Sequence, residues 1–327
     1  MKRLNSVLSM IPQRPPRSFE RWAKLSRFDV PDIDAFAKGE IPVGITTIHG
    51  EAVPIDLYAS IKPGAPLLVF LDGNLPRATM APLPYFSGFG VTPKDRPVSA
   101  ISISDPSFAL APDLTLAWYA GSEKMALQIL LVSILTKAVA VARPSKVVFM
   151  GGSGGGFASL FYSSFVQDSI ALVWNPQTDI RAYNPAHVEA YARIAFPADF
   201  LRLGDPAAVL DRNIVADVSR CYPNARNYVI YLQNALDWHV SGHLAPFLRK
   251  QCLQLPAAPF SGMIDQRLYL HLAEWGKGHV PPPKEVLTTL LAAVLDLPCR
   301  GMDQGATAAA LAYAFRVRTR SRVIART

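Results

Sequence analysis

The segment 146–162, KVVFMGGSGGGFASLFY, constrains the fold of this 327-residue chain more than any other part of it. It opens with a short apolar run, 147–150, of the kind that forms a buried strand. Glycines then surround Ser153, two before it and three after it, and apolar residues return at helical spacing over 157–165. The segment therefore predicts a strand, a tight glycine-rich turn and a helix in immediate succession.

A serine at the centre of such a turn is typical of a nucleophile elbow, G-x-S-x-G, in which the hydroxyl stands clear of a sheet edge. The serine backbone is then strained while the following helix passes close to the strand. Residues without a Cβ two positions before and after the serine make this approach possible. Gly151 and Gly155 occupy those positions.

A nucleotide-binding loop and a plain structural turn are the two alternatives to the elbow. A dinucleotide-binding loop needs glycines at positions i, i+2 and i+5, but the third position is Phe157 when counted from Gly152 and Ser159 when counted from Gly154. A phosphate loop needs a Lys-Ser or Lys-Thr pair, and none follows the turn. A plain structural turn remains as the alternative to the elbow.

Strand-like and helix-like segments alternate along the rest of the chain, which predicts an α/β fold with a mostly parallel, doubly wound sheet. Two early segments that alternate in a β-like way suggest a hairpin, and later apolar runs are typical of buried parallel strands. Helices are expected over 122–142, after the turn, and after the proline run 281–283. The expected strands are 41–48, 52–61, 67–71, 98–103, 147–150, 170–174, 228–232 and 268–272.

The domain organisation follows from shifts in composition. Residues 1–40 are basic and proline-rich and are expected to form an N-terminal arm, with a short helix around 18–25. The main domain is expected over 41–298, and a basic tail over 299–327. Within the domain, prolines divide 176–226 into short helical pieces, so this segment is expected to be an insertion and a candidate lid over the site.

The formal net charge of +8 is concentrated at the two ends. Residues 1–27 carry a net charge of +6 and residues 300–327 a net charge of +5, so the body between them is slightly acidic. Basic termini of this kind either contact anionic surfaces weakly or are simply solvated chain ends. We expect no nucleic-acid partner, and the sequence leaves the oligomeric state unknown.

The localisation expected from the sequence is cytoplasmic. The basic start is followed by only a short apolar stretch and then prolines, unlike a secretory signal. The apolar segment 125–142 approaches the length of a membrane span, but a buried crossover helix explains it equally well. Cys221, Cys252 and Cys299 form neither a zinc pattern nor a disulfide framework, which fits a reducing compartment.

Three chemically complementary residues follow successive expected strands. Ser153 follows one strand, Asp237 lies five residues beyond Leu232, and His279 lies seven residues beyond Leu272. A serine hydroxyl needs a general base, and the base needs an acid that orients it. The order Ser, Asp, His along the chain is the order used with a nucleophile elbow. On these residues the sequence resembles the α/β-hydrolase superfamily over roughly residues 41–298.

The resemblance implies a role for each residue. Ser153 would be the nucleophile, His279 the general base and then acid, and Asp237 the group that fixes the imidazole tautomer. The backbone N–H of Gly154 would be one oxyanion donor. The second would come from the loop after 67–71, which reads Asp72-Gly73-Asn74 where the family often has His-Gly, so the donor stays open between Gly73 and Asn74. No cofactor is implied.

Alternatives exist for the acid and for the histidines. Asp179 follows the strand at 170–174 and is the rival acid. His239 and His243 lie four residues apart near Asp237, which raises a metal-site interpretation, D-x-H-x-x-x-H, although a glycine elbow has no role in such a site. His239 and the aromatic Tyr183 of the insertion are otherwise candidate pocket residues.

Three functions are compatible with these residues. The first is a serine hydrolase that cleaves an ester-type acyl bond, in a small molecule or on a polymer, through an acyl-enzyme. The second is an acyltransferase or a glycan- or polymer-modifying esterase that uses the same three residues. The third is a non-catalytic binding protein on this scaffold, because a fold does not by itself dictate function.

Overall fold

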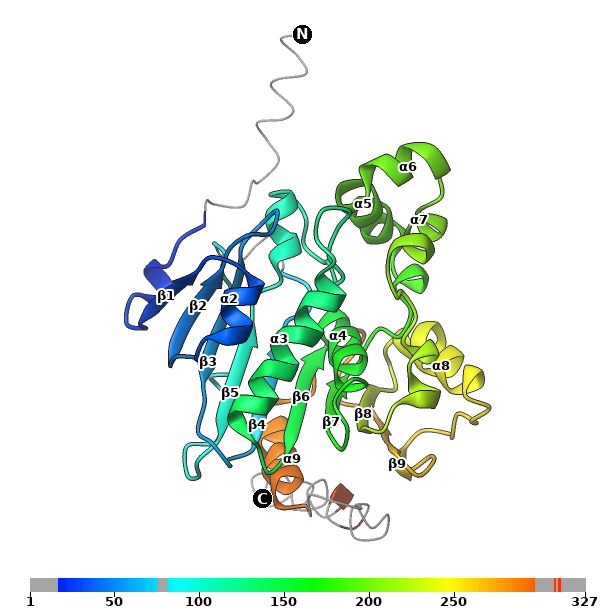
Figure 1. Ribbon diagram of the computed structural model, residues 1–327. Coiled ribbons are helices and arrows are strands. Elements are labelled where there is room, and N and C mark those ends of the chain that lie inside the picture. The colour runs from blue at the N-terminus through cyan, green and yellow to red at the C-terminus, as the bar shows by residue number, and fades with distance from the viewer. Residues whose placement is uncertain (1–16, 76–81, 298–308, 310, 313–327) are drawn as a thin grey trace.

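A computed structural model describes residues 17–75, 82–297, 309, 311 and 312 (Figure 1). Ten strands in this part of the chain form one mixed sheet. Strand β3 runs antiparallel to both of its neighbours and β9 is antiparallel to β10, whereas the other pairs are parallel. Across the sheet the order is β1 (Arg27–Val30), β2 (Gly44–Ile48), β3 (Ile55–Ser60), β5 (Ser99–Ile103), β4 (Leu67–Leu71), β6 (Val147–Gly152), β7 (Ile170–Trp174), β8 (Tyr228–Asn234), β10 (Leu268–Ala273) and β9 (Phe260–Met263).

The expected α/β class, with a mostly parallel sheet wound on both faces, is confirmed. Side chains alternate along each strand, so one strand supplies both faces with apolar groups. In β4, Val69 packs into the core beneath helices α3 (Leu127–Ala142) and α4 (Ser153–Ser163), whereas Leu68 packs into the core beneath α9 (Lys284–Asp296). Figure 1 shows α3 and α4 in front of the sheet.

The sheet begins earlier in the chain than the expected boundary at residue 41. Strand β1 lies within the segment expected to be an arm, and its Arg27 stands opposite Ile45 of β2 in parallel register. Helix α2 (Ile33–Lys38) connects the two strands, and its Phe36 is buried. The helix expected around 18–25 is a single 3-10 turn, Glu20–Trp22.

Helix α3 accounts for the apolar segment 125–142. Its Leu131, Ile134 and Leu135 are buried in the core against the sheet. The residues that precede it, from Ser122, form a turn and not the first turn of the helix. Among the described helices, none has both the length and the apolar character that a membrane crossing requires.

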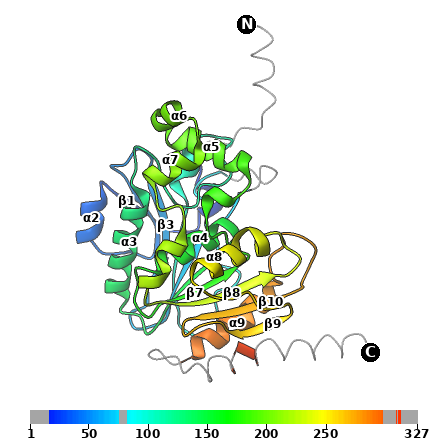
Figure 2. The ribbon, with the colours of Figure 1, turned by 90° about the vertical axis from the view of Figure 1, so that its right-hand side faces the viewer.

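The segment 176–226 contains the helices α5 (Pro185–Ala195), α6 (Pro197–Leu203) and α7 (Pro206–Asn213), which lie together beside one end of the sheet (Figures 1 and 2). Each helix has a proline at its first position, where the missing N–H costs no helical hydrogen bond. Asn184 and Asp205 cap α5 and α7 by accepting hydrogen bonds from backbone N–H groups. The sequence therefore sets these boundaries locally.

The C-terminal part of the described chain closes the second face of the sheet. The buried ammonium of Lys146 donates to the carbonyl oxygens of Val294, at 2.6 Å, and Leu295, at 3.3 Å, and so satisfies the last turn of α9. Leu311 is buried against the same core. Apart from residues 309, 311 and 312, the tail expected over 299–327 lies outside the described residues, as does the arm before residue 17.

Candidate active site

Ser153 sits at the junction of β6 and α4, where the sequence predicts the elbow. Its φ is 53°, in the left-handed region that strains a residue with a side chain. The flanking glycines permit the close packing, because a Cβ at Gly155 would lie 2.2 Å from the carbonyl oxygen of Leu71. A Cβ at Gly151 would lie equally close to the carbonyl oxygen of Gly155. Strand, turn and helix can approach this closely only without those side chains.

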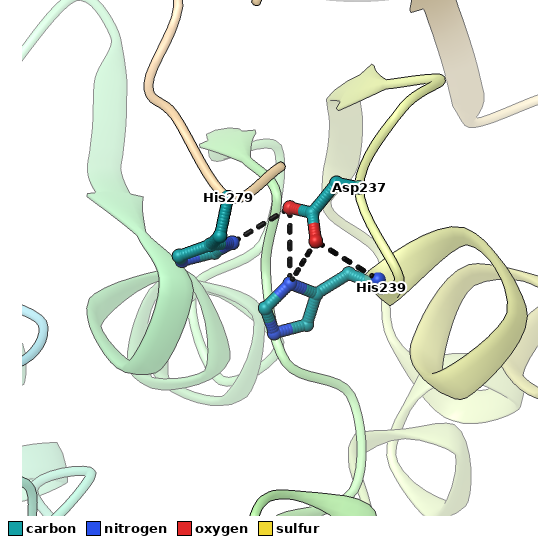
Figure 3. A group of neighbouring side chains, drawn as sticks. All are labelled: Asp237, His239 and His279. Carbon is teal, nitrogen blue, oxygen red and sulfur yellow. Dashed lines mark hydrogen bonds and ion pairs between the residues drawn. The ribbon is translucent and has the colours of Figure 1, made fainter. Parts of the chain in front are cut away.

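Asp237 and His279 meet in a hydrogen bond. Asp237 follows the end of β8 and His279 follows the end of β10, and these two strands are parallel neighbours. Nδ1 of His279 lies 2.6 Å from Oδ2 of Asp237 (Figure 3). The Asp237 side chain is fully buried, whereas 35% of the His279 side chain is exposed. The carboxylate is therefore placed to hold one ring nitrogen while the other faces away from it.

His239 makes a second set of contacts with the same carboxylate, as Figure 3 shows. Its Nδ1 lies 2.9 Å from Oδ1 and 3.0 Å from Oδ2 of Asp237, and its backbone N–H donates to Oδ1 at 3.0 Å. Burial acts to raise the pKa of Asp237, but the hydrogen bonds from His239 and His279 outweigh it and hold the pKa well below its usual range. Burial lowers the pKa of His239, which favours the neutral ring.

The metal interpretation does not fit these distances. Possible ligand atoms of Asp237, His239 and His279 lie within 4.8 Å of one another. Neighbouring ligands of a tetrahedral zinc ion, with bonds of about 2 Å, would be roughly 3.3 Å apart. The observed contacts of 2.6–3.0 Å are instead those of direct hydrogen bonds. The second histidine of that alternative pattern, His243, is turned to another partner, because its Nδ1 accepts from the N–H of Thr178 at 3.3 Å.

Ser153 and His279 line the same pocket, which has a volume of about 590 Å³. Oγ of Ser153 accepts a hydrogen bond from the amide Nε2 of Gln177 at 3.1 Å. Among the described side chains, Oγ makes no hydrogen bond to His279. Catalytic hydrogen bonds are often long without substrate and tighten when it binds. The structure thus brings Ser153 and the Asp237–His279 pair to one pocket, with no hydrogen bond between Ser153 and His279 among the described contacts.

Of the two candidate pocket residues, Tyr183 lines this pocket and His239 is not among the described lining residues. The ring of His239 instead stacks on Tyr183, with centroids 5.9 Å apart, and packs beside His279, with centroids 4.2 Å apart. His239 therefore contributes to the site through Asp237 and His279. The rest of the pocket includes apolar side chains, among them Phe70, Val91, Met150 and Leu287.

The loop after β4 brings Gly73 over the start of α4. A Cβ built on Gly73 would lie 2.9 Å from the carbonyl oxygen of Gly152 and 3.6 Å from the backbone nitrogens of Gly154 and Gly155. The first N–H groups of a helix have no partner within the helix, so those of Gly154 and Gly155 need acceptors from outside it. The neighbouring N–H of Asp72 is already bonded to Oη of Tyr119 at 2.8 Å. Asn74, the other expected donor, is exposed at the pocket rim.

Asp72 is a buried carboxyl group within this loop. Burial raises its pKa to about 7, with a further contribution from nearby Asp105, although a contact with the Ser87 side chain opposes the shift. Its Oδ2 is inaccessible to solvent and has no hydrogen-bond partner among the described residues. The neutral carboxyl group is therefore the favoured form below that pH.

The rival acid, Asp179, is engaged elsewhere. Its carboxylate lies 2.6 Å from the Arg181 guanidinium and 3.4 Å from the Lys250 ammonium. Arg181 also reaches Asp211, and Lys250 reaches Asp217, both at 2.6 Å. These ion pairs tie the start of the 176–226 segment to α7 and to α8 (Ala245–Lys250). The carboxylate that the structure brings to His279 is that of Asp237.

Sequence reasoning missed one residue of the site, Gln177, which contacts the nucleophile candidate directly. It named His239 as a candidate pocket residue but missed its contacts with the acid candidate. The position of Gln177, three residues after β7, was a usable signal, because the carboxyl ends of neighbouring parallel strands meet at one edge. The orientation of His239 depends on the turn and on the π-helical segment, Val240–Leu244, that follows it. No pattern in the sequence predicts that segment.

Comparison with known proteins finds similarity only in structure. No family model matches the sequence, and no curated protein matches it. One similar structure is a mutant of the capsule O-acetyltransferase of Neisseria meningitidis serogroup A, solved with CoA. Its TM-score is 0.52 at 9% identity, and the match covers 79% of this chain and 98% of the acetyltransferase. An S-formylglutathione hydrolase from Agrobacterium tumefaciens has a TM-score of 0.49 at 12% identity, and the match covers 80% of this chain and 98% of that hydrolase.

An acylaminoacyl peptidase from Pyrococcus horikoshii has a TM-score of 0.47 at 10% identity, and the match covers 75% of this chain but only 39% of the peptidase. Similarity at these identities bears on the fold alone. The order of the strands, the antiparallel β3 and the serine turn at the end of the central strand β6, together with the similarity in fold to the capsule O-acetyltransferase, identify the fold of this chain as that of the α/β-hydrolases.

Proposed function

We propose that the protein is a serine hydrolase that cleaves an ester-type acyl bond through an acyl-enzyme intermediate. The observation that carries the proposal is the 2.6 Å contact between Asp237 and His279 at the pocket that Ser153 lines. The strained backbone of Ser153 supports it, since strain of this kind needs compensation elsewhere in the fold and clusters at functional sites.

Each step assigns a role to one group. Oγ of Ser153 attacks the acyl carbon while its proton passes to Nε2 of His279, and Asp237 holds the imidazolium that forms. The N–H of Gly154 and an N–H of the Gly73 loop donate to the oxyanion. His279 then gives the proton to the leaving alkoxide. Water repeats the sequence with the acyl-enzyme, so that the acid is released and Ser153 is restored.

Labelling with a fluorophosphonate tests the proposal. The wild-type protein should displace the probe's fluoride and carry the phosphonyl group on Ser153, whereas Ser153→Ala should remain unlabelled. Ser159→Ala is a matched control, because Ser159 is a buried serine of the same helix α4 and should not affect labelling. A folded wild-type protein that reacts no faster than Ser153→Ala would exclude the proposed nucleophile.

Transfer of the acyl group to an alcohol is the second candidate, covering sugar and polymer acceptors. It is favoured by the similarity in fold to an O-acetyltransferase. The same acyl-enzyme serves both reactions, so the fate of the acyl group separates them. Turnover of nitrophenyl esters of increasing acyl length, with and without added alcohols, measures this fate. Hydrolysis alone at every alcohol concentration would leave only the hydrolase.

A further inference from the structure

The contact between Gln177 and Ser153 has a fixed polarity. The indole N–H of Trp118 can only donate, and it donates to Oε1 of Gln177. The amide is therefore oriented with Oε1 towards Trp118 and Nε2 towards Ser153. Gln177 is fully buried and Trp118 is 1% exposed, so solvent does not compete for these groups.

The backbone of Gln177 strengthens this arrangement. Its N–H donates to the carbonyl oxygen of Ser153 at 3.1 Å, so that Gln177 contacts Ser153 through both main chain and side chain. The Trp118 ring is itself packed edge-on against Tyr183 and Tyr191. The Nε2 group is thus held in place before any substrate arrives.

We propose that Gln177 is a catalytic residue, whose amide N–H donates to Oγ of Ser153 and stabilises the negative charge that develops on this atom during the reaction. The inference rests on the proposed function, since it requires Ser153 to be the nucleophile.

The chemistry of the hydroxyl group supports this role. An amide NH₂ has no lone pair to offer, so Oγ must accept from Gln177 and its own proton remains free for His279. When the proton leaves, the neutral hydrogen bond becomes an N–H to oxyanion bond, which is about twice as strong. In deacylation Oγ is the leaving group, and the same N–H assists its departure. Gln177 therefore acts on both halves of the reaction.

Gln177→Glu tests the inference with minimal change of shape. A glutamate oxygen still accepts from Trp118, but the ionised carboxylate has no hydrogen to donate to Ser153. We expect the second-order rate of phosphonylation of Ser153, and kcat for an ester, to fall roughly 10- to 100-fold. KM should change by less than about threefold, because the group contacts the nucleophile and not the substrate.

The pH dependence separates a catalytic role from a structural one. When the glutamate of the Gln177→Glu variant is protonated, it regains one O–H donor directed at Oγ. The ratio of the variant's rate to the wild-type rate should therefore increase as the pH falls. Groups that titrate in both proteins affect both rates equally, so their effect cancels in this ratio. Loss of packing alone would give a ratio that does not change with pH.

Gln128→Glu is the matched control. Gln128 makes the same two kinds of contact, since its Oε1 accepts from the N–H of Val215 at 2.9 Å and its Nε2 donates to the carbonyl oxygen of Val215 at 3.0 Å. It lies on α3 and does not line the Ser153 pocket. This variant should react with the probe as the wild-type protein does. If Gln177→Glu does not fold, Gln177→Met replaces it, with the same expected loss of rate and the same small change in KM; a Gln177→Met variant as fast as wild type would overturn the role of Gln177.

The outcomes distinguish the inference from the proposed function. If wild type is labelled at Ser153 and Gln177→Glu is labelled more slowly, both the hydrolase proposal and the role of Gln177 are supported. Labelled wild type with an equally fast Gln177→Glu overturns the role of Gln177 and leaves the hydrolase proposal intact. Wild type that is not labelled at Ser153 overturns both.

Discussion

The carboxylate of Asp237 lies 2.6 Å from Nδ1 of His279, and it is fully buried while the imidazole is partly exposed. A buried carboxylate accepts from the Nδ1–H and so selects the tautomer whose Nε2 has a free lone pair. In the proposed reaction that lone pair takes the serine proton. In that reaction Asp237 would act by accepting the Nδ1–H hydrogen bond of His279.

Replacing Asp237 with asparagine should test this role. The amide can donate to Nδ1 and would favour the tautomer whose Nε2 carries the hydrogen. We expect kcat for ester hydrolysis to fall by about 10³- to 10⁴-fold in a folded protein, as for comparable changes in serine hydrolases. Asp179→Asn is the control, because it should weaken the ion pairs with Arg181 and Lys250 and leave kcat within a few-fold. Similar kcat losses in both variants would contradict the assignment.

His239 should have a smaller effect on kcat than Asp237. His239→Phe removes one of the two imidazoles that stabilise the buried carboxylate but leaves the contact with His279. We expect about a 5- to 20-fold loss of kcat and a loss of roughly 1–3 kcal/mol in unfolding free energy, because Asp237 keeps its charge with fewer donors. Steady-state kinetics and urea unfolding measure the two effects. His239→Gln retains a donor and should recover part of both; equal losses in the two variants would contradict this explanation.

The strands of the fold could be predicted from the sequence where a continuous apolar run marked them. Continuous apolar runs placed β4 and β7 at their observed bounds, because strands buried on both faces need apolar residues throughout. Strands β1 and β9 were missed. Each has only four residues and none of them is buried, so neither carries an apolar pattern that separates it from a loop.

The site was accessible only in part, and the roles of its residues stay predictions. The meeting of Asp237 and His279 follows from the topology, since both come after the carboxyl ends of neighbouring parallel strands. The contacts of Gln177 and His239 depend on how individual turns direct their side chains. Such turns are fixed by tertiary packing, here by Trp118 and by the stacked rings around Tyr183.

His243 should make the protein sensitive to acid. Burial, followed by the effect of nearby His239, lowers its pKa to about 3, against an ordinary value of 6.5. Between these values the unfolded chain binds a proton that the folded protein does not, so this residue's contribution to stability is complete above pH 6.5 and is lost as the pH falls towards 3.

His243→Asn should remove that contribution, because asparagine does not titrate and its side-chain oxygen can accept from the N–H of Thr178. The decrease in unfolding free energy from pH 7 to pH 5 should be about 2 kcal/mol smaller in the variant than in wild type. Urea unfolding at the two pH values gives this difference. An equal decrease in both proteins would show that the fold does not lower the pKa of His243.

Asp72 should act in the opposite direction. Its pKa is raised from 3.8 to about 7, mainly by burial, so between these values the folded protein binds a proton that the unfolded chain releases. Its contribution to stability is therefore complete below pH 3.8 and is lost as the pH rises through 7. Asp72→Asn cannot ionise. The quantity to compare is the unfolding free energy of Asp72→Asn minus that of wild type. This difference should be roughly 2–4 kcal/mol larger at pH 8 than at pH 4.

The ionisation of Asp72 also bears on the reaction. Asp72 precedes Gly73, whose backbone lies over the start of α4, where the proposed oxyanion forms. A carboxylate there would repel the negative charge of the oxyanion. The ratio of kcat for Asp72→Asn to that of wild type should therefore increase as the pH rises from about 6 to about 8. The exposed Asp95 provides the control, since Asp95→Asn should give a ratio independent of pH. A constant ratio for Asp72→Asn as well would show that its charge does not reach the reacting carbonyl.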